Sequence, residues 1–201
     1  MDHDTFWQLV DDARTRAGQG ADDRGAQDDP LPGTLTTLLV ERLTPDEILA
    51  FATVADAVSS AAYAWPVWGA AYLIEGGCSD DGFMDFRDGL VLAGREVFTR
   101  TVADPDSLAE HPVVLGMGAE GSGWFGYESL DSLVGEAWTQ ATGRDDEAYY
   151  AAREAASSSG ESADDADGEE ISSSDPSGES WDFDDEDENR RRLPRLAALF
   201  D

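Results

Sequence analysis

Lysine is absent from this chain of 201 residues, and all 13 of its basic residues are arginines. This absence excludes Schiff-base chemistry on a lysine and phosphate-binding loops that depend on one. The 44 acidic residues, of which 28 are Asp and 16 are Glu, give a formal net charge of −31. Because a field of this sign repels phosphate groups, we expect no direct binding of nucleic acid. A salt-rich cytoplasm and a high-GC genome would each account for the composition.

Cysteine and long apolar runs are also scarce. The single cysteine, Cys78, excludes an internal disulfide, as is usual in a reducing cytoplasm. The chain opens with acidic residues, where a secretory signal would have a basic stretch followed by an apolar one. The longest uncharged run, residues 57–74, contains Ser and Pro and is typical of buried helices, not of a membrane span. We therefore expect a cytoplasmic protein that does not enter a membrane.

Apolar residues recur at helical spacing along most of the chain, which predicts a mainly α fold. Thr44-Pro45-Asp46-Glu47 combines a capping threonine, a first-turn proline and a capping-box glutamate, and so predicts a helix start. A polar loop is expected over residues 20–32 and a glycine-rich separator over 116–126, while residues 113–117 are the one candidate strand. Ser79 is expected to cap one long helix whose buried face carries Phe83, Phe86, Leu90, Ala93 and Val97.

Acidic residues are concentrated near the end of the chain, where residues 161–188 hold 14 acids and no base. Residues 157–179 consist largely of Ser, Asp, Gly and Glu, a composition that predicts disorder. Residues 180–201 are more apolar, and we expect them to pack back on the helical domain 1–156 through a short docking helix. The sequence thus predicts a single helical domain with a disordered acidic insertion before its C-terminal segment.

Several motifs resemble a bacterial family, the domain of unknown function numbered 4240. The central ones are Trp68-Gly69-Ala70-Ala71-Tyr72-Leu73-Ile74, Gly76-Gly77-Cys78-Ser79-Asp80-Asp81-Gly82-Phe83 and Phe86-Arg87. The family's outer motifs are resembled by three further segments of this chain: Phe6-Trp7, Asp104-Pro105-Asp106-Ser107-Leu108 and Arg192-Leu193-Pro194-Arg195-Leu196. The resemblance covers most of the chain except the acidic insertion. It implies no settled activity, and some relatives look fused to nucleic-acid-associated or regulatory modules.

The segment 76–87 joins one helix end to the next helix start. Glycines that permit left-handed backbone, followed by Ser and Asp at a helix N-terminus, explain the segment as a folding device. The functional interpretation makes it a ligand site. Arg87 either pairs with Asp80, Asp81 or a distant Glu, or presents its guanidinium to a carboxylate or phosphate. Trp65 and Tyr72 are then either the walls of that pocket or part of the core. The ligand-binding candidates are Trp68, Cys78, Ser79, Asp80, Asp81 and Arg87.

Two kinds of chemistry could take place at or beside this segment, namely catalysis by a cysteine and binding of a cation. Cys78 stands beside a helix N-terminus, which lowers the pKa of a thiol and favours a nucleophile, and His111 is its one plausible base. The alternative is a small buried cysteine. Asp81, Asp85 and Asp88 share a helix face that suits a divalent cation or a cationic substrate, or else reflects an acid-rich surface. No standard metal motif is present, so we expect no metal and no cofactor.

The leading hypothesis is a non-catalytic binding or regulatory domain that acts through protein contacts or a small ligand at segment 76–87. The first alternative is an enzyme of unknown reaction that uses Cys78, Asp80, Asp81 and Arg87; its catalytic residues are otherwise unknown. The second alternative is an acidic nucleic-acid mimic that occupies a basic protein. Its docking segment would be residues 181–188, where Trp181 and Phe183 stand among acids.

Overall fold

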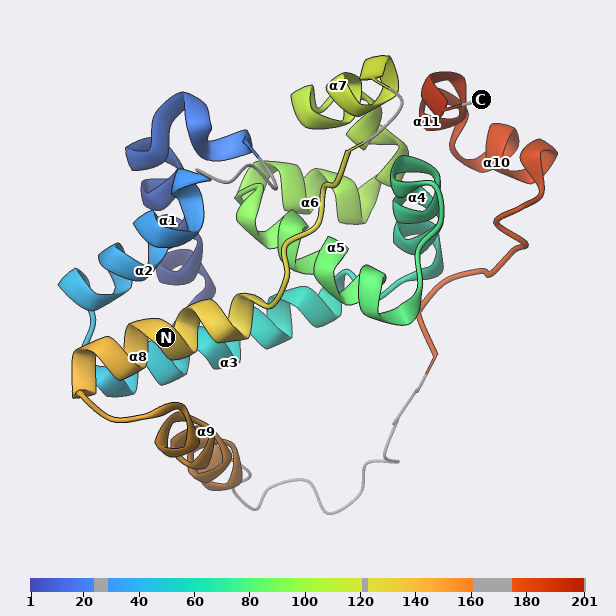
Figure 1. Ribbon diagram of the computed structural model, residues 1–201. Coiled ribbons are helices and arrows are strands. Elements are labelled where there is room, and N and C mark those ends of the chain that lie inside the picture. The colour runs from blue at the N-terminus through green and yellow to red at the C-terminus, as the bar shows by residue number, and fades with distance from the viewer. Residues whose placement is uncertain (24–28, 121–122, 161–174, 201) are drawn as a thin grey trace.

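The computed structural model describes residues 1–23, 29–120, 123–160 and 175–200, and helices dominate it without any strand in these ranges (Figure 1). The predicted mainly α fold is confirmed. In chain order the elements are α1 His3–Ala17, η1 Gly18–Asp22, α2 Pro30–Arg42, α3 Pro45–Ala61, α4 Trp65–Glu75, α5 Asp80–Leu92, α6 Arg95–Ala103, η2 Pro105–Glu110, α7 Pro112–Glu120, α8 Leu130–Thr142, α9 Asp146–Gly160, α10 Glu186–Arg192 and α11 Pro194–Phe200.

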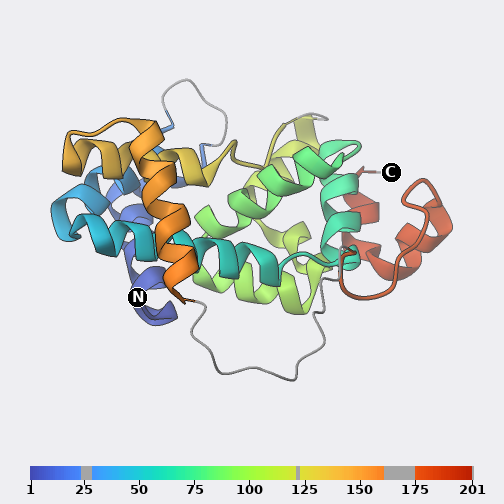
Figure 2. The same ribbon diagram turned by 90° about the horizontal axis from the view of Figure 1, so that it is seen from below.

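The helices form two groups around one continuous core. α1, α2, α3 and α8 make one side of the molecule, and α4, α7 and α11 make the other, with α5 and α6 between them (Figure 1). α3 and α8 lie side by side, and α9 packs across both of them (Figure 2). Burial of aromatic side chains along α1, α3 and α5 supplies much of the hydrophobic stabilisation; the fully buried phenylalanines are Phe6, Phe51, Phe83, Phe86 and Phe125.

The predicted helix starts are confirmed in detail. The Thr44 hydroxyl oxygen accepts from the Glu47 N–H at 3.4 Å, and the Glu47 carboxylate accepts from the Thr44 N–H at 2.8 Å. Ser79 caps α5 by accepting from the Gly82 N–H at 3.2 Å. These caps satisfy backbone donors that a helix N-terminus leaves without intrahelical partners.

Three expectations about element boundaries were wrong. The long helix expected after Ser79 is broken at Gly94, whose φ of +93° cannot continue a helix, so α5 and α6 are separate. Residues 113–117 are helical, because Val114 and Met117 bury one face of α7. The first part of the glycine-rich separator, residues 116–120, therefore belongs to α7. The polar loop also ends early, since α2 begins at Pro30.

Residues 175–200, here called the C-terminal strap, dock on the helical domain, whereas docking was predicted for residues 180–201 and disorder for 157–179. Trp65 N–H donates to the Ser177 carbonyl at 2.8 Å, which joins the strap to the start of α4. Further along, the buried Asp106 carboxylate of η2 accepts from the Arg195 and Leu196 N–H groups at 3.0 and 2.9 Å. The expected single docking helix is in fact two short helices, because Pro194 cannot donate a helical hydrogen bond to α10.

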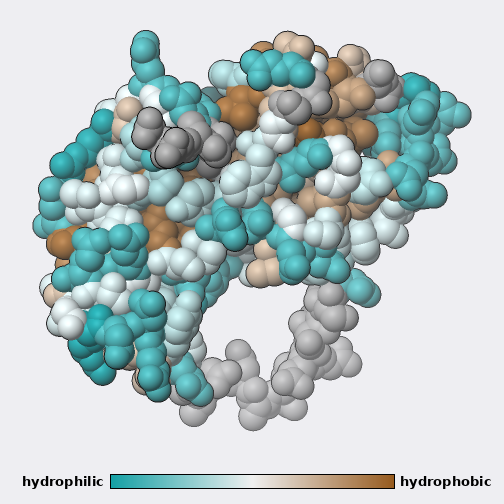
Figure 3. All heavy atoms as spheres, in the orientation of Figure 1, coloured by the Kyte–Doolittle hydropathy of each residue, from teal (hydrophilic) through white to brown (hydrophobic). Residues whose placement is uncertain are grey.

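The expected acidic insertion falls largely outside the described residues, namely at 161–174. Its described flanks belong to other elements: Ser157 lies in α9, and Ser177 and Glu179 lie in the strap. Hydrophilic residues cover most of the face shown in Figure 3. None of the described helices combines the length and apolar character that crossing a membrane requires.

Candidate functional site

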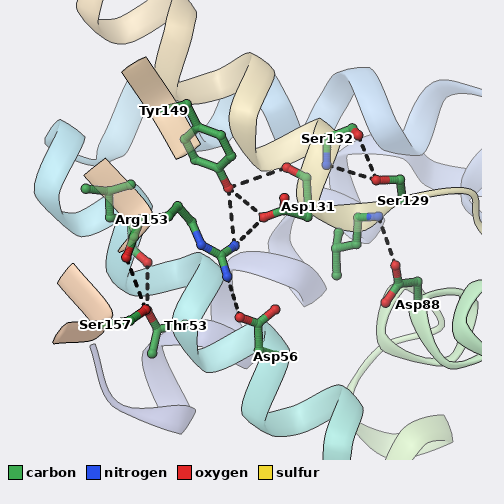
Figure 4. Close-up of polar contacts among 11 residues, drawn as sticks. Thr53, Asp56, Asp88, Ser129, Asp131, Ser132, Tyr149, Arg153 and Ser157 are labelled. Carbon is green, nitrogen blue, oxygen red and sulfur yellow. Dashed lines mark hydrogen bonds and ion pairs between the residues drawn. The ribbon is translucent and has the colours of Figure 1, made fainter. Parts of the chain in front are cut away.

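A cleft of about 420 Å³ opens between α3, α5, α8 and α9. Its volume lies within the range of small-molecule sites. Apolar side chains of α3 and α8 line part of it, and polar side chains project into it from all four helices (Figure 4). The polar groups that matter below are Ser59, Asp56, Asp85, Arg87, Asp88 and Arg153.

Arg87 is held at the cleft by aromatic faces instead of by an acid. Its guanidinium carbon lies 4.9 Å from the ring centroid of Tyr63 and 5.3 Å from that of Phe83, a cation–π arrangement. Arg87 Nη1 donates to the Ser59 carbonyl at 3.2 Å, whereas the buried Nε has no partner among the described residues. Burial lowers the pKa of Arg87. The expected pairing of Arg87 with Asp80 or Asp81 was therefore wrong.

Asp88, the next residue on α5, reaches the start of α8. Its Oδ2 accepts from the Leu130 N–H at 2.9 Å, and burial is the main reason that its pKa rises from 3.8 to about 6. Ser129, which caps α8, has a φ of +60° and is the one non-glycine residue with positive φ in the described chain. The turn is therefore strained at the point where Asp88 holds it.

Arg153 of α9 closes the other end of the cleft through ion pairs with Asp56 of α3 and Asp131 of α8 (Figure 4). The Tyr149 hydroxyl donates to Asp131 at 2.7 Å. Burial raises the pKa of Tyr149 above its ordinary value, so the phenol stays protonated. This network braces three helices and pairs the single positive charge of Arg153 with two carboxylates. Sequence reasoning missed it because its members are far apart in the chain, on three separate helices.

The cleft as a whole carries an excess of acid. Four aspartates and two arginines line it, which leaves two formal negative charges. Burial raises the pKa of Asp85 as well as that of Asp88, and the nearby carboxylates of Glu128 and Asp81 add to the effect at Asp85. Asp85 and Asp88 form no ion pair among the described residues, and a carboxylate whose pKa is raised in this way favours a nearby cation.

The predicted aromatic pocket walls lie elsewhere. Trp68 stacks between Trp65 and Phe83, at centroid distances of 5.4 and 4.8 Å, and its Nε1 donates to the Cys78 carbonyl at 3.0 Å. Trp65, Trp68 and Tyr72 all contact Phe183 of the strap. These aromatics therefore receive the strap instead of lining the cleft.

Cys78 does not have the character of a nucleophile. Burial, with smaller contributions from the Glu75, Asp85 and Asp80 carboxylates, raises the pKa of the thiol to about 12, so the expected lowering was wrong. His111, the expected base, lies at the start of α7, where its Nδ1 accepts from the Val113 N–H at 3.3 Å and its ring packs on Phe125. The half-buried thiol thus remains protonated at neutral pH.

Ser79, Asp80 and Asp81 are exposed at the first turn of α5, outside the cleft. The expected acidic face is divided, because Asp85 and Asp88 line the cleft but Asp81 does not. The described residues hold no group of three or more side chains suited to a metal ion. Of the six predicted ligand-binding residues, the structure places Arg87 alone in the cleft.

One family model, that of the proteins of unknown function DUF4240, matches residues 1–140. No curated protein and no solved structure matches the chain. The matched residues include the α3 and α5 walls of the cleft and nearly all of α8, whereas α9, the strap and the landmark expected at 192–196 lie beyond them. Because the match covers well over half of the sequence, the chain belongs to the DUF4240 family.

Proposed function

We propose that this protein is a non-catalytic binding or regulatory domain that holds a small ligand in the cleft beside Arg87. The observation that carries the proposal is the Arg87 guanidinium, which lines the cleft with one hydrogen bond to protein and a buried Nε that has none among the described residues. An arginine has five N–H donors, and leaving buried donors without acceptors is costly. A bound ligand with an acceptor group would pair with the guanidinium N–H groups that remain accessible in the cleft.

The same geometry argues against the enzyme alternative. Cys78 is protonated at neutral pH, and Asp80 and Asp81 are exposed at the end of α5 that lies away from the cleft. A nucleophile needs an activating base within hydrogen-bond reach, and His111 is engaged at the start of α7. The groups invoked for catalysis therefore do not converge on one reacting atom.

The three methionines of the chain provide a direct test. Met84 is 56% exposed at the cleft, whereas Met117 is 5% exposed on α7 and Met1 lies at the start of the chain. In protein labelled with ¹³C on the methionine methyl groups, a library of small polar fragments should yield compounds that shift the Met84 signal and leave Met117 unmoved. Arg87→Gln should abolish those shifts, and the matched surface change Arg42→Gln should preserve them.

A library that shifts no Met84 signal, or one whose hits survive Arg87→Gln unchanged, would contradict the proposal. Hits that move Met84 and Met117 together would indicate a general perturbation of the fold. Such hits would also count against a site in the cleft.

The acidic nucleic-acid mimic is a second candidate function, because the aromatic side chains of the strap face the helical domain while several of its acidic side chains face solvent. Trp181 and Phe183 pack inward on α4, while Asp182, Glu186 and Asp187 are exposed. A basic partner would therefore meet carboxylates. Replacing Asp182, Glu186 and Asp187 by their amides should abolish binding of a polyarginine peptide if the mimic proposal holds, and should leave cleft ligands unaffected. Unchanged peptide binding would exclude the strap carboxylates as the docking element.

A further inference from the structure

We infer that the ligand of the cleft is zwitterionic: a compound with one amine and one carboxylate joined by a short apolar chain. The inference rests on the proposed binding function and names the ligand chemistry that the cleft is built to take. It follows from three parts of the cleft: the Arg87 guanidinium and the Asp85 and Asp88 carboxylates of α5, which form no ion pair among the described residues, and apolar side chains of α3, α5 and α8 that line the same cleft.

Arg87 supplies the anion-binding end. Tyr63 and Phe83 fix the plane of the guanidinium, and the Ser59 carbonyl holds Nη1 at 3.2 Å. A guanidinium with a fixed plane presents its remaining N–H groups in the geometry that a carboxylate accepts. No carboxylate of the described chain forms an ion pair with Arg87, although Asp88 follows it directly on α5.

Asp85 and Asp88 supply the cation-binding end. They are three residues apart on α5 and both line the cleft. Asp88 accepts one hydrogen bond, from the Leu130 N–H at 2.9 Å, and neither carboxylate forms an ion pair with an arginine among the residues described. Two carboxylates on one helix face repel each other, and an ammonium group between them reverses that repulsion.

Arg153 is excluded as a second anion site, because its guanidinium already pairs with Asp56 and Asp131. With Arg153 neutralised, Arg87 faces two aspartates, and a ligand with several negative charges would be repelled. The net charge of −31 on the whole chain adds to this repulsion at longer range. A ligand that matches both unpaired centres carries one charge of each sign.

The apolar part of the ligand is inferred from the apolar side chains that line the same cleft. They are formed by short or flexible apolar side chains: Ala52, Ala55, Met84, Leu130 and Val134. A cleft of about 420 Å³ is near the lower end of the range for ligand sites, so an amino-acid-sized compound fits better than a nucleotide cofactor.

Three compounds of matched length test the inference: 6-aminohexanoate, hexylamine and hexanoate, titrated at pH 8 while the Met84 methyl signal is followed. We expect 6-aminohexanoate to bind at least about tenfold more tightly than either singly charged compound. Arg87→Gln should reduce its affinity to that of hexylamine, and Asp88→Asn should weaken it by about tenfold. Asp81→Asn, an acid-to-amide change on the exposed first turn of the same helix, should leave the affinity unchanged.

The outcomes separate this inference from the proposed function. Equal affinity for hexanoate or hexylamine would overturn the zwitterionic ligand while leaving the cleft as a binding site. The same holds if fragments bind the cleft but 6-aminohexanoate does not shift Met84 up to about 10 mM. If neither the fragments nor the three compounds bind, both proposals fall. An unmoved Met117 signal in each variant verifies that the fold is intact.

Discussion

Arg87 and Asp88 are neighbours on α5 that form no ion pair with each other. Arg87 turns toward Tyr63 and Phe83, while Asp88 turns toward the N-terminus of α8. Each is therefore partly buried without an ion pair, and burial shifts the pKa of each toward the neutral form, although the charge of its neighbour opposes that shift. Residues in this state cost stability in the free protein, which is common where a binding site is prepared in advance.

Replacing Asp88 by Asn should stabilise the protein at pH 8 and not at pH 4. The folded chain raises the pKa of Asp88 from 3.8 to about 6, so stability from this group falls as pH rises through that window. At pH 8 the Asp88 carboxylate is ionised and its burial destabilises the folded state fully. Removing the charge should therefore raise the free energy of unfolding by about 2 kcal/mol. Urea denaturation at both pH values measures the difference.

Asp81→Asn is the control for this prediction, because it removes one exposed charge from the same helix. Its effect measures the general gain from reducing the net negative charge. An equal effect of Asp88→Asn at pH 4 and pH 8, or one no larger than that of Asp81→Asn, would count against the cost assigned to Asp88.

The Cys78 thiol should react slowly with an aromatic disulfide reagent in the folded protein. Burial raises its pKa to about 12, so the thiolate fraction at pH 8 is far below that of an ordinary cysteine. We expect the reaction to be at least about a hundredfold slower than in the same chain unfolded in urea. Equal rates in the folded and unfolded chain would restore Cys78 as a candidate nucleophile.

The helices differ in how clearly local residues mark them, and this difference decides which helices can be predicted from the sequence. The starts of α3 and α5 are marked by local caps at Thr44 and Ser79, and both were predicted. α9 was not, because Tyr149 alone among its described side chains is buried, and the partly buried Ala148 and Ala152 beside it make only a weak apolar stripe. The cleft was also beyond sequence reasoning, since its walls come from four helices. The sequence singled out three of the cleft residues, namely Arg87 from a local motif and Asp85 and Asp88 from the acidic face of one helix.

Gly69→Ala should destabilise the protein, although alanine normally favours a helix. A Cβ at position 69 of α4 would lie 2.2 Å from the Trp181 ring, so the strap would have to shift. We expect a loss of about 1–3 kcal/mol in the free energy of unfolding. Gly116→Ala is the matched control: a Cβ there, in the middle of α7, meets nothing within 4 Å. It should stabilise by up to about 1 kcal/mol.

Adding Trp181→Ala to Gly69→Ala distinguishes a steric clash from a general effect on α4. The double variant should lose less than the two single losses combined, because the small side chain removes the clash. Additive losses would mean that Gly69 and Trp181 are not coupled through the docked strap.

The molecule as a whole is dominated by repulsion among its acids. Many of the described arginines take part in ion pairs, such as those of Arg195 with Asp104, Asp106 and Glu110. Exposed pairs of this kind contribute little each, and 13 bases cannot offset 44 acids. The net field therefore opposes the compact state and excludes anionic ligands from the surface.

Salt should stabilise this protein, since screening weakens repulsion among its acids more than it weakens its ion pairs. Between about 0.1 and 2 M KCl at pH 7.5 we expect Tm to rise by about 5 °C, equivalent to about 2 kcal/mol for a chain of this length. The rise should shrink at pH 4, where many carboxylates are neutral. A Tm that falls with salt would mean that ion pairs outweigh the repulsion.

The central claim, that the cleft beside Arg87 binds a zwitterionic small molecule, is tested most directly by a crystal structure of the protein with 6-aminohexanoate. The account predicts that the ligand carboxylate lies within hydrogen-bond distance of the Arg87 guanidinium and that its amine lies at the carboxylates of Asp85 and Asp88. A ligand found instead among the aromatic side chains beneath the strap, or an empty cleft in crystals grown at saturating ligand, would contradict it.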